Sequence, residues 1–90
     1  MGVIALSGTM TCPEDMVQSV RQALKAHIRL SRAEPGCLAF DVRETEPGVF
    51  AVSERFETRA AFDAHQVRTR ASNWFALTGH LPRSYTVTEE

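Results

Sequence analysis

The side chains best suited to proton chemistry in this chain are a histidine on a predicted helix and a glutamate on a predicted strand. His65 lies three residues after Phe62, on a stripe of residues at helical spacing that should face the protein interior. A histidine in that position could act as a base or as a hydrogen-bond donor near neutral pH. The alternative is a half-buried structural histidine that is satisfied by a backbone carbonyl or by Glu54.

Glu54 occupies a strand position where an apolar side chain would be expected, because it alternates with Val52 and Phe56. A carboxylate there needs a partner, since an unpaired buried charge is costly. His65 or an arginine could supply that partner. The alternative is a structural ion pair near the open end of the sheet.

Apolar side chains could wall a pocket beside these two groups. Several phenylalanines lie on faces that should converge, and in a chain of 90 residues they must also serve as the core. The positions expected to contact a flat aromatic ligand are Ile4, Leu6, Phe40, Val52, Phe56, Phe62 and Phe75.

Other candidate groups have a weaker case. His27 lies on the inner stripe of an earlier helix and could line the same cavity. Trp74 lies one residue off the inner stripe of its helix, so we expect it at a helix edge or in a subunit contact. The spacing of His27, His65 and His80 does not match a metal site, and no glycine-rich phosphate loop is present. We therefore expect neither a metal nor an organic cofactor.

The elements that must position these residues follow from the hydrophobic periodicity. The pattern predicts a strand over 3–11, a helix from 13 to about 31, two strands joined by a turn at 46–48, a helix from 58 to 79 and a strand over 83–88. Thr11 and Glu14 have capping-box spacing, and Thr58 should cap the second helix. Right-handed crossovers then favour one α+β domain over residues 1–90. Its order is β-α-β-β-α-β, with a ferredoxin-like four-stranded antiparallel sheet and both helices on one face.

The two faces of this sheet should differ. On the second strand, Leu38, Phe40 and Val42 should lie under the helices with the other apolar side chains. The opposite face should carry small side chains where a solvated face would carry more charge, and small side chains let a second sheet approach closely. We therefore expect a homodimer through this face. The residues concerned are Ala5, Ser7, Thr9, Cys37, Ala39, Val49, Ala51 and Ser53.

Composition excludes several classes of partner. The net charge of −1 gives no electrostatic case for nucleic acid or an anionic membrane. No apolar run approaches the roughly 20 residues of a membrane span, and the first residues lack the basic region of a secretory signal. Cys12 and Cys37 are too few for a disulfide framework, so we expect reduced thiols and a cytoplasmic location.

Three segments in a fixed order carry a family resemblance: Glu34-Pro35-Gly36-Cys37-Leu38-Ala39-Phe40, then Ser53-Glu54-Arg55-Phe56-Glu57-Thr58, then Ala61-Phe62-Asp63-Ala64-His65. Together they resemble the antibiotic biosynthesis monooxygenase family. The resemblance implies a dimeric α+β barrel with a cavity between the helices and the sheet, lined from the helix position of His65. It also implies oxidation of a small phenolic or quinol-like ring by molecular oxygen, without a flavin or a metal.

On this basis His65 would be the base or anion stabiliser, Glu54 would orient it, and the phenylalanines would hold the ring. Two other functions stay open on the same fold. An isomerase of a small phosphorylated or keto metabolite should have Arg68 or Arg70 near the pocket. A non-catalytic dimeric ligand-binding or stress protein should have a filled cavity. A flat apolar cavity favours the oxygenase, and an anion bound among arginines favours the isomerase.

Overall fold

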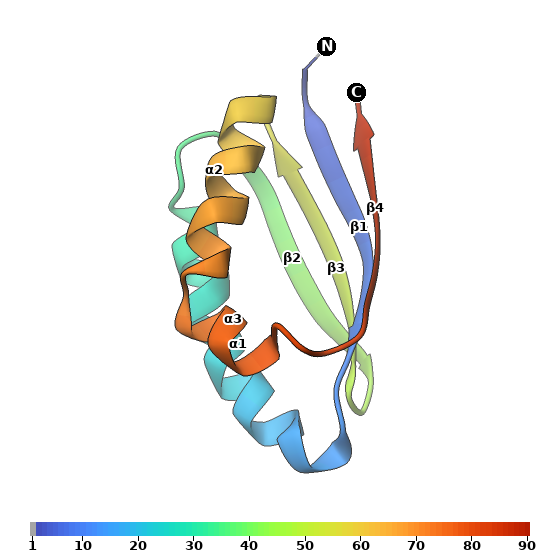
Figure 1. The fold of residues 1–90 in the computed structure, drawn as a ribbon. Coiled ribbons are helices and arrows are strands. Elements are labelled where there is room, and N and C mark those ends of the chain that lie inside the picture. Colours follow the sequence, from blue (N-terminus) through green and yellow to red (C-terminus); the bar gives the residue numbers. More distant parts are fainter. Residues whose placement is uncertain (1) are drawn as a thin grey trace.

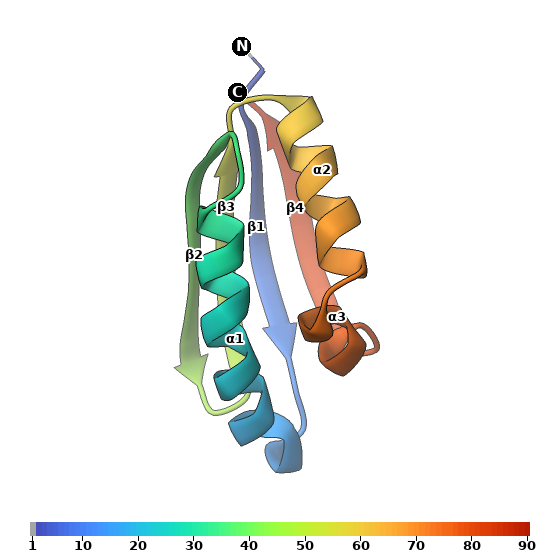
Figure 2. The same ribbon diagram turned by 90° about the vertical axis from the view of Figure 1, so that its left-hand side faces the viewer.

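The computed structural model describes residues 2–90 and has the predicted order of elements, with the second helix divided in two. The sheet has the order β2-β3-β1-β4, and every neighbouring pair is antiparallel. All helices cover one face of it (Figure 1). Figure 2 shows α1 in front of β2 and β3, and α2 with α3 toward β4. The elements are β1 Ile4–Thr11, a 3₁₀ turn Glu14–Met16, α1 Val17–Arg32, β2 Cys37–Glu46, β3 Val49–Phe56, α2 Arg59–Arg70, α3 Asn73–Thr78 and β4 Arg83–Glu89.

The core lies between the sheet and the helices, as the alternation in β1 and β3 predicts. One cluster contains Ile4, Leu6, Phe40, Val52, Phe56 and Phe62. A second contains Met10, Val20, Leu24, Phe50, Trp74 and Leu81. The buried polar and charged side chains are His27, Ser31, Glu54, His65 and Thr78.

The helix predicted over 58–79 is interrupted between Arg70 and Asn73. Ser72 has an extended backbone, and its Oγ accepts a hydrogen bond from the N–H of Phe75 at 3.2 Å, so it caps a new helix. A serine side chain competes in this way with helix continuation. Thr58 caps α2 as predicted, with Oγ1 accepting from the N–H of Ala61 at 3.0 Å.

The start of the first helix also differs from the prediction. Thr11 belongs to β1, pairs with Val49 and donates its N–H to the carbonyl of Pro82 at 3.1 Å. The capping box with Glu14 is therefore not formed. Pro13 leads instead into a 3₁₀ turn without a side-chain cap.

An irregularity at the start of β2 corrects the predicted faces of two residues. The register with β3 shifts between Cys37 and Ala39, so an extra residue stands in β2 there. Leu38 is consequently 51% exposed, although we expected it in the core, and Cys37 packs against the core instead of lying on the opposite face. Phe40 and Val42 keep the predicted side.

The face of the sheet away from the helices carries the small residues of β1 and β3, among them Ala5, Ser7, Ala51 and Ser53. The homodimer through this face stays a prediction.

Among the helices of residues 2–90, none is both long enough and apolar enough to cross a membrane.

Candidate functional site

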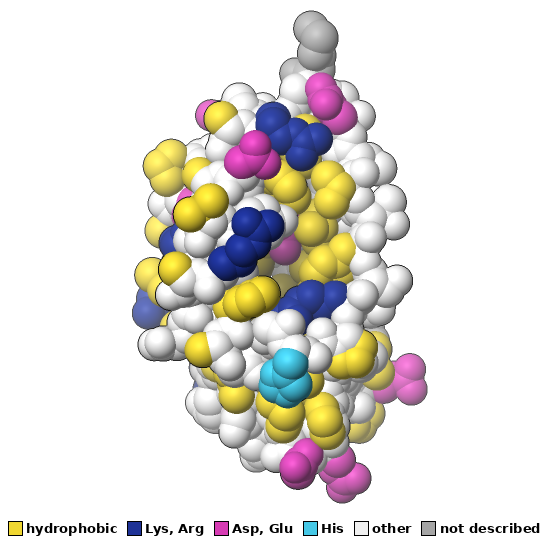
Figure 3. Space-filling model, in the orientation of Figure 1, with side chains coloured by type: hydrophobic (Ala, Val, Ile, Leu, Met, Phe, Trp, Pro, Cys, Tyr) yellow, Lys and Arg dark blue, Asp and Glu magenta, His cyan; other side chains and the backbone are white. Residues whose placement is uncertain are grey.

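A cavity of about 260 Å³ lies between the sheet and the helices. Sites for drug-sized ligands usually occupy about 300–1,000 Å³, so this cavity suits a small molecule. Figure 3 shows it from outside as a hollow with hydrophobic walls, basic side chains beside it and an acidic group at its depth. Six of the residues that we expected to form the site line this cavity: Leu6, Phe40, Val52, Glu54, His65 and Phe75.

Three predicted ligand contacts lie in the core instead of the cavity wall. Ile4 and Phe56 are fully buried, and Phe62 packs edge-on against Phe56 with ring centroids 5.9 Å apart. All three side chains belong to one core cluster and do not line the cavity. Phe56 still supports the site, because its ring lies 4.9 Å from that of His65.

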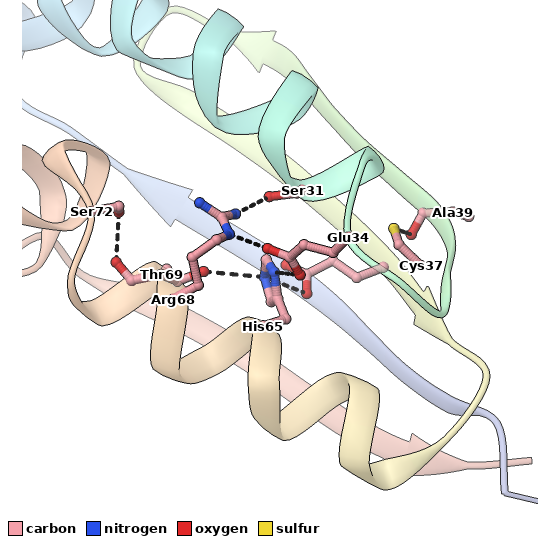
Figure 4. A network of polar contacts seen from close by, with 9 residues as sticks. Ser31, Glu34, Cys37, Ala39, His65, Arg68, Thr69 and Ser72 are labelled. Carbon is pink, nitrogen blue, oxygen red and sulfur yellow. Dashed lines mark hydrogen bonds and ion pairs between the residues drawn. The ribbon is translucent and has the colours of Figure 1, made fainter.

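His65 is held by a carboxylate that was not among the expected site residues. Its Nδ1 lies 2.9 Å from Oε1 of Glu34, which follows α1. The other carboxylate oxygen of Glu34 accepts from Nε of Arg68, whose Nη2 donates to Oγ of Ser31 at 2.8 Å (Figure 4). His65 and Arg68 are three residues apart on α2, so one carboxylate can reach both side chains.

This arrangement fixes the tautomer of His65. A carboxylate paired with Arg68 is ionised and only accepts hydrogen bonds, so Nδ1 of His65 carries the proton. Nε2 then presents a lone pair, which accepts a hydrogen bond from Oγ1 of Thr69 at 3.3 Å. Nε2 also lies 3.6 Å from Oε1 of Glu54, which exceeds the distance of a hydrogen bond, so Oε1 of Glu54 remains available to a ligand.

Glu54 is the unusual member of the site. It is 7% exposed, and within residues 2–90 its Oε1 has no hydrogen-bond partner. Burial, and then the nearby charge of Glu34, raise the pKa of Glu54 to about 7. Burial lowers the pKa of His65, while the charge and hydrogen bond of Glu34 act in the opposite direction.

The expected roles therefore change. Glu34, and not Glu54, forms the hydrogen bond to Nδ1 of His65, while burial raises the pKa of Glu54 to about 7. No periodic signal marked Glu34, because it lies in a connection between a helix and a strand.

His27 and Trp74 form one wall. Their rings stack with centroids 4.9 Å apart and planes 8° apart. Burial lowers the pKa of His27 to about 3, so its ring is neutral. Trp74 was expected at a helix edge, but it is buried and lines the cavity. The helix break at Ser72 changes the phase of the following turn and directs Trp74 inward.

The side chains that line the cavity form a gradient of exposure. Glu54, His27 and His65 are buried, whereas Arg83 is partly exposed and Arg70 is exposed. The arginines thus mark the mouth, and the carboxyl and imidazole groups mark the floor. Residues 2–90 contain no group of three or more His, Cys, Asp or Glu side chains that could hold a metal ion.

Comparison with known proteins agrees with the fold. Residues 3–77 match the family model of antibiotic biosynthesis monooxygenases. The Mycobacterium tuberculosis protein Rv0793, which is provisionally described as a monooxygenase, is 34% identical over 68 residues, covering 74% of this chain and 67% of Rv0793.

Solved structures show the same fold. The structure of Rv0793 has a TM-score of 0.81 at 29% identity, and the alignment covers 99% of this chain and 95% of the Rv0793 chain. A Deinococcus radiodurans protein assigned to the same family has a TM-score of 0.78 at 26% identity, covering 98% of this chain and 91% of its own. A Nitrosomonas europaea protein superposes with a TM-score of 0.86 at 20% identity, and the alignment covers 100% of this chain and 92% of the Nitrosomonas chain. The match to the family model and the identity with Rv0793 show that this chain belongs to the antibiotic biosynthesis monooxygenase family.

Proposed function

We propose that the protein is a monooxygenase that oxidises a small phenolic or quinol-like ring with molecular oxygen and without a bound cofactor. The observation that carries the proposal is the carboxyl group of Glu54. It is buried, its Oε1 has no hydrogen-bond partner among the described residues, and it lies beside Nε2 of His65 on the floor of an aromatic-walled cavity. A buried acid with a perturbed pKa in a cavity is a candidate for proton transfer.

The chemistry needs only a proton acceptor and a dry pocket. An ionised phenol is electron-rich enough to pass an electron to oxygen, and the two radicals then combine at a ring carbon. Loss of water from the resulting hydroperoxide leaves a quinone. One oxygen atom enters the ring and the other leaves as water, so the ring supplies all the electrons.

Each side chain of the site has a role in this scheme. Ionised Glu54 would take the phenol proton. His65, kept in one tautomer by Glu34, would first accept a hydrogen bond from the ring hydroxyl through Nε2, in place of the one from Thr69, and so hold the hydroxyl beside Glu54. Phe40 and Trp74 would enclose the ring and keep water from the intermediate.

We further propose that the protein acts as a homodimer through the outer face of its sheet. Ala5 and Ala51 lie there with serine and threonine side chains, which allow close approach of a second sheet. The homodimer, an aromatic substrate and oxygen are thus the proposed partners.

One observation favours a second function. Arg70 lines the cavity, as expected for an isomerase of a small anionic metabolite, while Arg68 is engaged by Glu34. Proton transfer between adjacent carbons could use the same pair of Glu54 and His65. An isomerase would consume no oxygen.

Oxygen uptake with a panel of hydroquinones and anthrones tests the proposal. We expect uptake by the wild-type protein without added flavin, haem or metal, and a loss of about 10²- to 10⁴-fold in Glu54→Gln. Glu57→Gln removes an exposed carboxylate outside this cavity and should leave the rate unchanged. Equal rates in both variants would contradict the role of Glu54.

A further inference from the structure

We propose that the ligand of this cavity is an aromatic acid. Its hydroxyl group would meet Glu54 and His65 on the floor, and its carboxylate would lie at the mouth between Arg70 and Arg83. The inference rests on the proposed function for the ring hydroxyl and adds the chemical class of the substrate.

The first support is the distribution of charge around the cavity. On the floor, the carboxylate of Glu34 is paired with Arg68, and Glu54 is buried away from the mouth. At the mouth, Arg70 and Arg83 form no ion pair with a carboxylate in residues 2–90. The cavity thus has an uncompensated positive rim, which favours an anionic ligand.

Arg83 is held in place by neutral groups. Its Nη1 donates to the carbonyls of Thr78 at 2.6 Å and Leu81 at 3.2 Å, and its Nη2 donates to Oγ1 of Thr78 at 2.8 Å. A side-chain hydrogen bond to the phenol group of Tyr85 adds a further neutral partner. None of these partners is a carboxylate, so the guanidinium remains available for a charge-assisted contact with one.

The rim also carries aromatic side chains. The guanidinium of Arg83 lies 5.7 Å from the ring centroid of Phe75, and Tyr85 follows two residues later on the same face of β4. Phe75 and Tyr85 line the cavity together with Phe40 and Trp74, so a ligand ring in the cavity would have aromatic neighbours. At about 260 Å³, the space suits one or two rings with a short acidic substituent.

A matched pair of ligands tests the inference. Gentisate is hydroquinone with a carboxylate, and 2,5-dihydroxybenzamide is its neutral isostere. Calorimetric titration without oxygen measures the binding of both without turnover. We expect gentisate to bind about tenfold more tightly than the amide, the lower end of the range for hydrogen bonds between charged groups, because the rim is exposed.

Variants of two exposed arginines on α2 make the test specific. Arg70→Gln should reduce the preference for gentisate several-fold, and Arg70→Lys should restore part of it. Arg59→Gln removes the same charge from a residue that does not line the cavity and should retain the preference. Equal affinity for the two ligands in the wild type, an unchanged preference in Arg70→Gln, or no binding of gentisate at millimolar concentration would overturn the inference.

The outcome separates this inference from the proposed function. Arginine-dependent binding of gentisate without oxygen uptake on any phenol would support the anion site and contradict the oxygenase. Uptake with hydroquinone, together with equal affinity for gentisate and the amide, would support the oxygenase and contradict the anion site.

Discussion

Replacing Glu54 by glutamine should stabilise the protein while it removes most of the activity. In the folded protein the pKa of Glu54 rises from an ordinary value of 4.5 to about 7, because the carboxylate is buried. At about 1.4 kcal/mol per pKa unit, ionisation in the folded state costs about 3 kcal/mol. Glutamine has nearly the same shape and no charge, and its amide could donate to Nε2 of His65.

The sign of the pH dependence follows from proton binding. Between pH 4.5 and about 7 the folded state keeps the proton on Glu54 while the unfolded chain has lost it. The stability of the wild type therefore falls with rising pH across this window and stays at the lower value above it. Glu54→Gln has no ionisable group at this position. Its gain in the free energy of unfolding over the wild type should therefore be small at pH 4 and reach about 3 kcal/mol at pH 8.

Thermal unfolding at several pH values measures this difference at fixed protein concentration. For a domain of this size, 1 kcal/mol shifts the midpoint by about 4–8 °C, so the variant should melt more than 10 °C above the wild type at pH 8. Glu57→Gln is the control, and its midpoint should follow the wild type. A stability difference for Glu54→Gln that does not change with pH, or a loss of stability at pH 8, would refute the reasoning.

Three further predictions follow from the same site and sheet. The rate should rise with pH through a midpoint near 7, because only ionised Glu54 accepts a proton; a pH-independent rate between pH 5.5 and 8.5 would oppose this assignment. Glu34→Gln weakens the hold on Nδ1 of His65, so the maximal rate should drop about tenfold in steady-state assays, with far less change in product affinity. Ala51→Lys should convert the dimer to a 10 kDa monomer in light scattering, since it would bury an unpaired charge; a wild type that is already monomeric would disprove the interface.

The sequence predicted those parts of the site that lie on regular elements. Alternation in β3 placed Glu54 on the inner face, and helical spacing in α2 placed His65 there, as the structure confirms. Both signals depend only on the geometry of the backbone. The order of the sheet followed equally from short connections and right-handed crossovers.

The rest of the site depends on local irregularities of the backbone, which the periodic pattern of apolar residues does not reveal. Glu34 reaches His65 from a connecting segment, and Trp74 turns inward because a serine interrupts the helix. Leu38 is exposed because β2 contains an extra residue. The arginine rim brings together Arg70 from the end of α2 and Arg83 from the start of β4, and no sequence pattern marked Arg83 as a site residue.

Oxygen labelling tests the central claim most directly. The wild-type protein is first freed of metals by chelation and then incubated with ¹⁸O₂ and a hydroquinone or anthrone that it turns over. Mass spectrometry then measures how many ¹⁸O atoms the product contains. We predict one labelled oxygen atom per product molecule, with the other recovered as water, and no labelled product above background in Glu54→Gln. A product without label, or equal labelling in the variant, would contradict a monooxygenase that uses Glu54.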